Sequence, residues 1–223
     1  MKNDTQTTQN DTSDTSVTSD TYQQKKKIIV VSSGGCGSWC LVRYFRSIGY
    51  EATHIHSRYP PSKLRYGSDQ EKFSDRVVKE DDMENIKVIY IFRENIEKSI
   101  YSRFVERNWK QHLKHIECFH PDASFENLLS KKVDLFGLEN FFDNWTTSSP
   151  ERNYKIYCIK YETLFDNIVE IMNIIGNNSH KNVKKIAKIE TERNDVDKHT
   201  EDIREIYKTF IKKMMKMPFI KIV

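Results

Sequence analysis

The sequence predicts an α/β domain in which a central parallel sheet lies between helices, a three-layer α/β/α architecture. Three apolar runs predict strands: residues 28–31 (IIVV), 86–92 (IKVIYIF) and 154–161 (YKIYCIKY). Each run is followed by a segment with helical spacing of apolar residues. Strands that alternate with helices form right-handed crossovers, which build a parallel sheet covered on both faces.

The strand at 28–31 leads through a glycine-rich turn into a helix over 39–48. Leu41, Val42 and Phe45 give this helix one apolar side, and Gly49 is in position to end it. The later elements repeat this alternation of strand and helix. In order, we expect a strand over 50–56, a loop over 57–67, a helical or irregular segment over 69–85, helices over 93–108, 138–145 and 162–175, a polar segment over 177–199 and a helix over 202–217.

The composition fits one domain preceded by a polar tail. Residues 1–24 are nearly all Asn, Asp, Thr, Ser and Gln, so they cannot bury enough apolar surface to fold and are predicted to be disordered. The folded domain then covers residues 25–223. No apolar run approaches the ~20 residues of a membrane span, and the N-terminus does not resemble a signal peptide, which predicts a soluble, cytoplasmic protein.

Charge and cysteine content exclude some classes of partner. The net charge of +4 favours anionic ligands only mildly. Basic residues near aromatic ones are balanced by acids, so no nucleic-acid partner is expected. The four cysteines lack the paired spacing of a metal site, so we expect reduced thiols and no metal.

The glycine-rich segment 32–38 (SSGGCGS) has the composition of a phosphate-binding loop. Glycines allow the backbone to turn tightly and to approach a ligand, and N–H groups at the start of the following helix attract anions. The segment has no lysine and does not match G-x-G-x-x-G, which argues against a Walker-type ATPase. The alternative is a tight turn that binds nothing.

Polar residues follow three of the predicted strands, at 32–38, 54–58 and 93–102. In open α/β sheets, ligands bind beyond the carboxyl ends of the strands. These three segments are therefore the predicted functional edge of the sheet.

Three motifs along this edge together resemble one family. They are the loop SSGGCGSW, the segment FRENIEKSIYSRF and the segment IKYETLFDN. In this order and spacing they resemble the sulfotransferases that use 3′-phosphoadenosine 5′-phosphosulfate (PAPS), with a P-loop-like sulfotransferase architecture. The resemblance covers about residues 28–175, and it implies transfer of a sulfuryl group to a hydroxyl or amine, with a carbohydrate or small molecule as the expected acceptor.

The resemblance also implies which residues bind PAPS. The 5′-phosphosulfate would lie on the loop, and the 3′-phosphate would be held by an arginine and by a serine on the next helix. Of the serines on that helix, Ser102 lies nearest the family position. The implied set is Gly34, Gly35, Cys36, Gly37, Ser38, Trp39, Arg93, Ser99 and Ser102. A guanidinium suits this role because it binds phosphate through two hydrogen bonds.

The chain departs from the family pattern at Gly35, where the family usually has a basic residue. That residue stabilises charge on the transferred group, and such stabilisation is often the largest catalytic effect. Lys63 or Arg58 from the next loop could substitute for it. The family's Arg-Lys-Gly loop near the C-terminus is also missing.

Two histidines are candidates for the general base. His54 and His56 lie two apart at the end of a predicted strand, so they share a face, and His56 is nearer the carboxyl end. The alternative is that both merely form hydrogen bonds at the strand end. Metal binding by the pair would need a third ligand, and none is evident. Glu162 is expected to hold backbone N–H groups.

Two further functions stay open. A catalytically inactive sulfotransferase fold would serve as a nucleotide-binding module, and the glycine at position 35 supports this alternative. A P-loop small-molecule kinase would need a loop lysine and a magnesium-binding acid. The segment with Trp109, His112, His115, Phe119 and His120 could line an acceptor site or could be ordinary packing.

Overall fold

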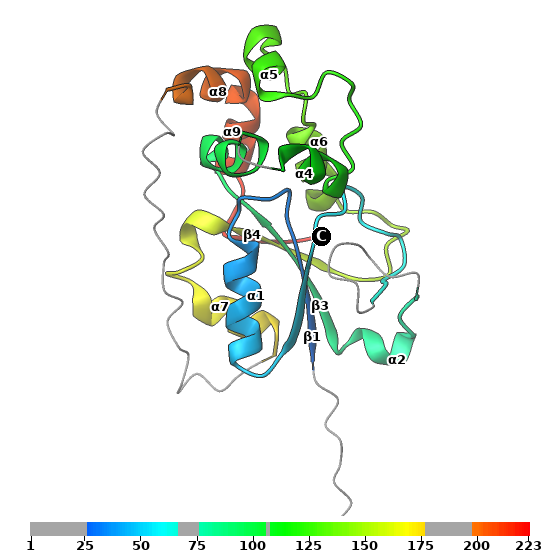
Figure 1. Cartoon of the computed structure of the whole chain (residues 1–223). Helices are drawn as coiled ribbons and strands as arrows, with labels where there is room; N and C mark the ends of the chain where they lie inside the picture. The colour runs from blue at the N-terminus through cyan, green and yellow to red at the C-terminus, as the bar shows by residue number, and fades with distance from the viewer. Residues whose placement is uncertain (1–25, 67–75, 106–107, 177–197) are drawn as a thin grey trace, which may run out of the picture.

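The computed structural model describes residues 26–66, 76–105, 108–176 and 198–223 as one α/β fold around a five-stranded sheet (Figure 1). The strand order is β2-β1-β3-β4-β5. The strands are β1 (Lys27–Val31), β2 (Glu51–Ile55), β3 (Ile86–Phe92), β4 (Ile156–Lys160) and β5 (Ile220–Ile222). Neighbours from β2 to β4 pair in parallel, and β5 pairs antiparallel with β4.

The helices differ in length and are often short. They are α1 (Ser38–Ser47), α2 (Glu80–Met83), α3 (Ile96–Ile100), α4 (Trp109–His115), α5 (Phe125–Lys131), α6 (Leu138–Thr146), α7 (Ile168–Ile174), α8 (Thr200–Ile206) and α9 (Lys208–Met215). A π-helical turn, η1 (Tyr101–Val105), continues α3, and a 3₁₀ turn, η2 (Tyr161–Thr163), follows β4. Among the described residues, no helix is long and apolar enough to cross a membrane.

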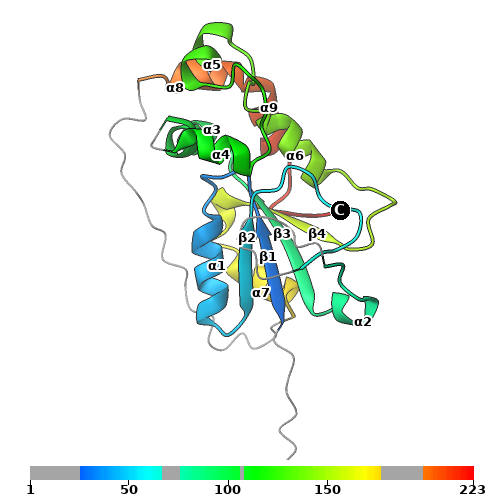
Figure 2. The same cartoon turned by 45° about the vertical axis from the view of Figure 1, so that its right-hand side comes forward.

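The sheet separates two apolar clusters because successive side chains of a strand point to opposite faces. Ile28 and Val30 of β1 belong to the cluster that α1 and α7 cover, whereas Ile29 and Val31 belong to the cluster that α6 and α9 cover. In the turned view α1 lies to the left of the strands, whereas α6 and α9 lie above them toward the right (Figure 2). Helices α4, α5 and α8 gather beyond the carboxyl ends of the parallel strands (Figures 1 and 2).

The predicted elements around the first loop are confirmed closely. Helix α1 ends where expected, because Gly49 has a φ of +95° and its N–H donates to the Arg46 carbonyl at 3.1 Å. The Tyr50 N–H donates to the Phe45 carbonyl at 3.0 Å, which completes a Schellman C-cap. The third predicted strand is shorter than its apolar run, and the 3₁₀ turn replaces its end.

The prediction of an all-parallel sheet is only partly right. The C-terminal strand β5 lies antiparallel at one edge, and its three residues gave no pattern from which to predict it. The helix expected over 93–108 begins at Ile96 and widens to a π turn at Tyr101. The last helix breaks at Tyr207, whose buried hydroxyl donates to Oδ1 of Asp134 at 2.7 Å. The predicted tail over 1–24 and nearly all of the polar segment 177–199 lie outside the described residues.

Candidate functional site

The loop between β1 and α1 is shaped by glycines and by one buried serine. Gly34, Gly35 and Gly37 have φ values of +98°, +68° and +76°, a left-handed region that favours glycine. The Ser32 hydroxyl donates to Oγ of Ser38 at 3.1 Å and accepts the Gly34 N–H at 3.3 Å. The loop therefore keeps its shape through its own side chains.

The backbone amides that follow in the chain have no hydrogen-bond acceptor among the residues that the structure describes. The Leu41 N–H donates to the Gly37 carbonyl at 3.2 Å and closes the first turn of α1. Within the described residues, the backbone N–H groups of residues 35–40 donate no hydrogen bond. Such free amides at the start of a helix carry partial positive charge, and this is the usual backbone arrangement for binding an anion.

Neighbouring elements approach the loop glycines more closely than a Cβ atom would allow. A Cβ on Gly34 would lie 2.5 Å from Cε1 of His112, and one on Gly35 would lie 2.6 Å from Oγ of Ser102. A Cβ on Gly37 would overlap the ring of Tyr161. The glycines are thus required both by their φ angles and by the elements packed against them.

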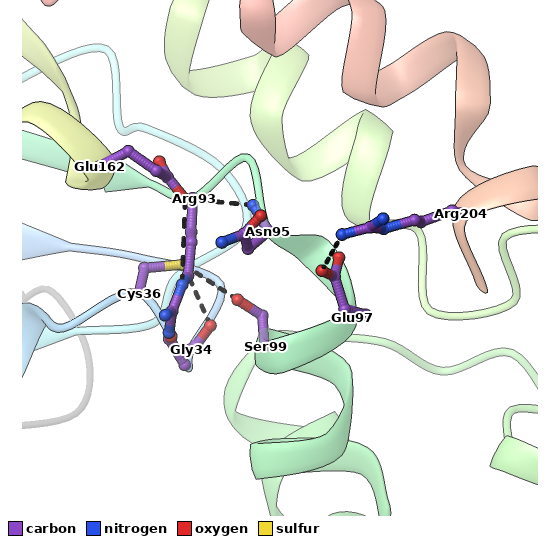
Figure 3. Close-up of polar contacts among 9 residues, drawn as sticks. Gly34, Cys36, Arg93, Asn95, Glu97, Ser99, Glu162 and Arg204 are labelled. Carbon is purple, nitrogen blue, oxygen red and sulfur yellow. Dashed lines mark hydrogen bonds and ion pairs between the residues drawn. The ribbon is translucent and has the colours of Figure 1, made fainter. Parts of the chain in front are cut away.

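Arg93, directly after β3, contacts the loop. Its Nη1 donates to the Gly35 carbonyl at 3.1 Å, and its guanidinium carbon lies 4.6 Å from the centre of the Tyr161 ring. Its Nε lies 4.0 Å from Oε1 of Glu162, which also accepts the Asn95 N–H at 3.1 Å (Figure 3). The glycine loop, the arginine after β3 and the Tyr161-Glu162 pair, which are far apart in sequence, therefore meet at one edge of the sheet.

Two polar atoms in this arrangement lack a hydrogen-bond partner. Within the described part of the chain, the buried Nε of Arg93 and the buried Oε2 of Glu162 make no hydrogen bond. A buried charged group without its full set of hydrogen bonds is unfavourable. Arg93 and Glu162 therefore keep unused hydrogen-bonding capacity beside the loop.

The two candidate serines lie beside the loop. Ser99 of α3 is buried, and its Oγ lies 3.8 Å from the Cys36 sulfur (Figure 3). Ser102 in η1 is half-buried and donates to the Ser99 carbonyl at 3.0 Å. Burial raises the pKa of the Cys36 thiol to about 11, so this cysteine is protonated at neutral pH and shapes the loop by donating to the Gly34 carbonyl at 3.1 Å.

The predicted histidine pair belongs to a larger cluster. The rings of His54 and His56 are 4.2 Å apart, and His56 lies 5.2 Å from His112 and 6.4 Å from His115, both on α4. The Nδ1 of His56 lies 2.5 Å from the Ser32 carbonyl, and Nε2 of His112 lies 2.9 Å from the Ser33 carbonyl. Because a carbonyl only accepts, each of these nitrogens carries the proton, and Nε2 of His56 has the free lone pair.

Three of these histidines, His54, His56 and His112, are neutral at pH 7. Burial, together with the charge of Arg103 and of the neighbouring histidines, lowers the pKa of His54 to about 4 and that of His112 to about 3. The pKa of His56 falls to about 3 for the same reasons, burial being the largest. Among the described residues, no three His, Cys, Asp or Glu side chains are placed to hold a metal ion together.

Trp39 and the two proposed substitute cations occupy different surroundings. Trp39 is 44% exposed at the start of α1, and its ring lies 5.5 Å from the His54 ring and 5.6 Å from the guanidinium carbon of Arg46. Arg58 is buried and donates to the carbonyls of Ile116, Phe136 and Gly137. Lys63 is exposed on the surface. The guanidinium of Arg58 is therefore engaged within the fold in this arrangement.

In the sequence, His112 and His115 belong to a stretch rich in aromatic residues and histidines. Their spacing of three residues places both side chains on one side of α4. This spacing is the feature of the sequence that indicates their proximity. The structure brings them to His54 and His56, while Phe119 from the same stretch is 79% exposed. Comparison of the chain with protein-family models, with curated proteins and with solved structures gives no match.

Proposed function

We propose that the protein transfers a sulfuryl group from PAPS to a hydroxyl or amine acceptor. The observation that carries this proposal is the meeting of the loop, Arg93 and Glu162 at the carboxyl edge of the sheet. In this function the free amides of residues 35–40 bind the 5′-phosphosulfate. Arg93 and Ser102 bind the 3′-phosphate, with Ser99 behind them against the loop. The Arg93 side chain is 19% exposed, and this accessible part of the guanidinium supports the fit of a second anionic group.

PAPS supplies an activated sulfuryl group when bound. The acceptor oxygen or nitrogen forms a bond to sulfur, the bridging bond between sulfur and the phosphate oxygen breaks, and adenosine 3′,5′-bisphosphate leaves. The acceptor proton goes to Nε2 of His56, whose lone pair is kept free because Nδ1 donates to the Ser32 carbonyl. A pKa of about 3 makes His56 a weak base in the free protein. Negative charge bound on the adjacent loop raises that pKa and so improves the base.

The second candidate is a nucleotide-binding module without turnover. It is supported by the burial of His56, which is 7% exposed, together with its lowered pKa. In that case the same loop and Arg93 bind the nucleotide, and no proton transfer follows.

Calorimetric titration with adenosine 3′,5′-bisphosphate, ATP and GTP tests the binding step. We expect the bisphosphate to bind more tightly than either triphosphate. Absence of bisphosphate binding would contradict both candidates. Transfer of radiolabelled sulfate from PAPS to a panel of carbohydrates, phenols and amines then separates them, because the binding module gives no labelled product with any acceptor.

A matched pair of variants tests the assigned position of the nucleotide. Arg93→Met keeps the length of the side chain and removes the charge, so we expect about a tenfold or greater loss of bisphosphate affinity, as for a charge-assisted hydrogen bond. Arg43→Met removes the same charge from the exposed side of α1 and should leave the affinity unchanged. Equal affinities in the two variants would remove Arg93 from the binding site.

A further inference from the structure

The loop that binds the anion in the proposed function has no cationic side chain of its own. Residues 32–39 are SSGGCGSW, so the negative charge of a sulfuryl or phosphoryl group there meets only amide dipoles. Arg93 is already engaged with the Gly35 carbonyl, the Tyr161 ring and Glu162. Arg58 is engaged with three carbonyls elsewhere. A further cation at this loop would therefore have to come from another element.

Arg103 of the π-helical turn η1 runs along the loop. Its Cγ lies 3.2 Å from the point that a Cβ on Gly34 would occupy, so its aliphatic stem packs on that glycine. The preceding residue, Ser102, covers Gly35 in the same way. The π turn thus sets two consecutive polar side chains against two consecutive glycines. π turns occur often at functional sites because they change the direction of side chains within a helix.

The charge of Arg103 is exposed and not neutralised by the described residues. Arg93 lies beside Glu162, and Arg204 of α8 pairs with the buried Glu97 at 2.9 Å (Figure 3). Arg103 has no such ion pair within the described part of the chain, and its side chain is exposed. The Cγ of Arg103 and the ring of His112 pack against the same residue, Gly34. The positive charge of Arg103 also contributes to lowering the pKa of His54, His56 and His112.

We propose that Arg103 binds the anionic group held by the free amides of residues 35–40 and supplies the positive charge that the loop lacks. This inference rests on the proposed function and names the residue that neutralises the transferred sulfuryl group or its 5′-phosphate. Its stem packs on Gly34, whereas Arg93 contacts the carbonyl of the next residue, Gly35. Its charge stabilises the anion electrostatically, and it acts by direct contact with the ligand.

The test compares Arg103→Met, which keeps the stem and removes the charge, with Arg103→Lys, which keeps a charge. Binding of adenosine 3′,5′-bisphosphate, PAPS and inorganic pyrophosphate is measured by calorimetry for wild type and both variants, after circular dichroism has shown that each is folded. We expect Arg103→Met to weaken binding of PAPS and pyrophosphate about ten- to hundredfold, and Arg103→Lys to recover part of that loss.

The outcomes separate this inference from the function on which it rests. If wild type binds none of the three ligands, the proposed function fails. If wild type binds them and Arg103→Met binds them equally well, Arg103 is not in the site while the function stands. If Arg103→Met and Arg103→Lys lose equal affinity, the charge is irrelevant and the proposal is overturned. Loss of affinity in Arg103→Met together with partial recovery of affinity in Arg103→Lys supports the proposal.

Discussion

Acidification should destabilise this fold through its buried histidines. Burial lowers the pKa of His54 to about 4, and those of His56 and His112 to about 3, from an ordinary value of 6.5. The unfolded chain therefore binds protons as the pH falls below about 6.5, whereas the folded protein does not bind them until about pH 4 or lower. A lowered histidine pKa thus gives a stability that is greatest at high pH and decreases on acidification.

The size of the effect follows from proton linkage. When the pH falls from about 7.5 to about 5.5, each such histidine lowers the free energy of unfolding by about 1.4 kcal/mol. The three together lower it by roughly 4 kcal/mol. This is a large part of the ~5–15 kcal/mol that stabilises a typical domain. Burial raises the pKa of Asp134, which acts in the opposite direction at lower pH. For this reason, the change in the free energy of unfolding between the two pH values is best compared between variants.

The assay is urea-induced unfolding at the two pH values. We expect His54→Gln to reduce the loss on acidification by about a third, because one of the three linked protons is removed. His120→Gln changes an exposed histidine outside the cluster and should leave the loss as in wild type. An unfolding midpoint that does not change between the two pH values would refute the neutral, buried state of these histidines. An equal loss of unfolding free energy on acidification in His54→Gln and His120→Gln would refute it as well.

Three further predictions concern single side chains. Gly35→Ala should destabilise the fold by about 2 kcal/mol or more, because its methyl group meets Ser102 and the backbone of α3. Gly49 also has a positive φ but has open space around it, so Gly49→Ala should cost about 1 kcal/mol, and urea unfolding compares the two variants. His56→Gln should lower kcat for sulfuryl transfer about a hundredfold with little change in bisphosphate affinity. Sulfate-transfer assays measure the first quantity and calorimetry the second. Arg58→Met should cost about 3 kcal/mol in unfolding free energy, because three carbonyls lose their donor.

Each of these predictions has an outcome that contradicts it. Equal stability of the two glycine variants would mean that α3 yields to the added methyl group. A His56→Gln variant with wild-type kcat would assign the proton transfer to another group. For Arg58, the control is Arg43→Met on the exposed side of α1, and a similar small loss in both would show that the buried hydrogen bonds contribute little.

Local sequence accounts for the strands and for the loop. The runs at 28–31 and 86–92 became strands with almost the predicted bounds, because uninterrupted β-branched and aromatic residues suit a strand that is buried on both faces. Gly34, Gly35 and Gly37 indicated a tight loop in the right place, because left-handed φ values are accessible mainly to glycine. The antiparallel β5 gave no such signal, because three edge residues are too few to show a period.

The composition of the site depended on long-range contacts. His56 and His112 are 56 positions apart, and their contact at 5.2 Å exists because α4 packs over the ends of β1 and β2. Arg58 looked like a free cation in a loop, yet its partners are backbone carbonyls that only the fold brings together. Arg103 packs on Gly34 because it lies in the π turn, and no local pattern in the sequence indicates this contact.

The sequence by itself determined the alternation of strands and helices, the glycine loop and the edge of the sheet at which ligands are expected. These follow from preferences that act within a few residues of the chain. Only the tertiary structure decided which histidines cluster, which arginine is used internally and which one remains exposed beside the loop. Such pairings are set by the packing of distant elements, and no local pattern in the chain records them.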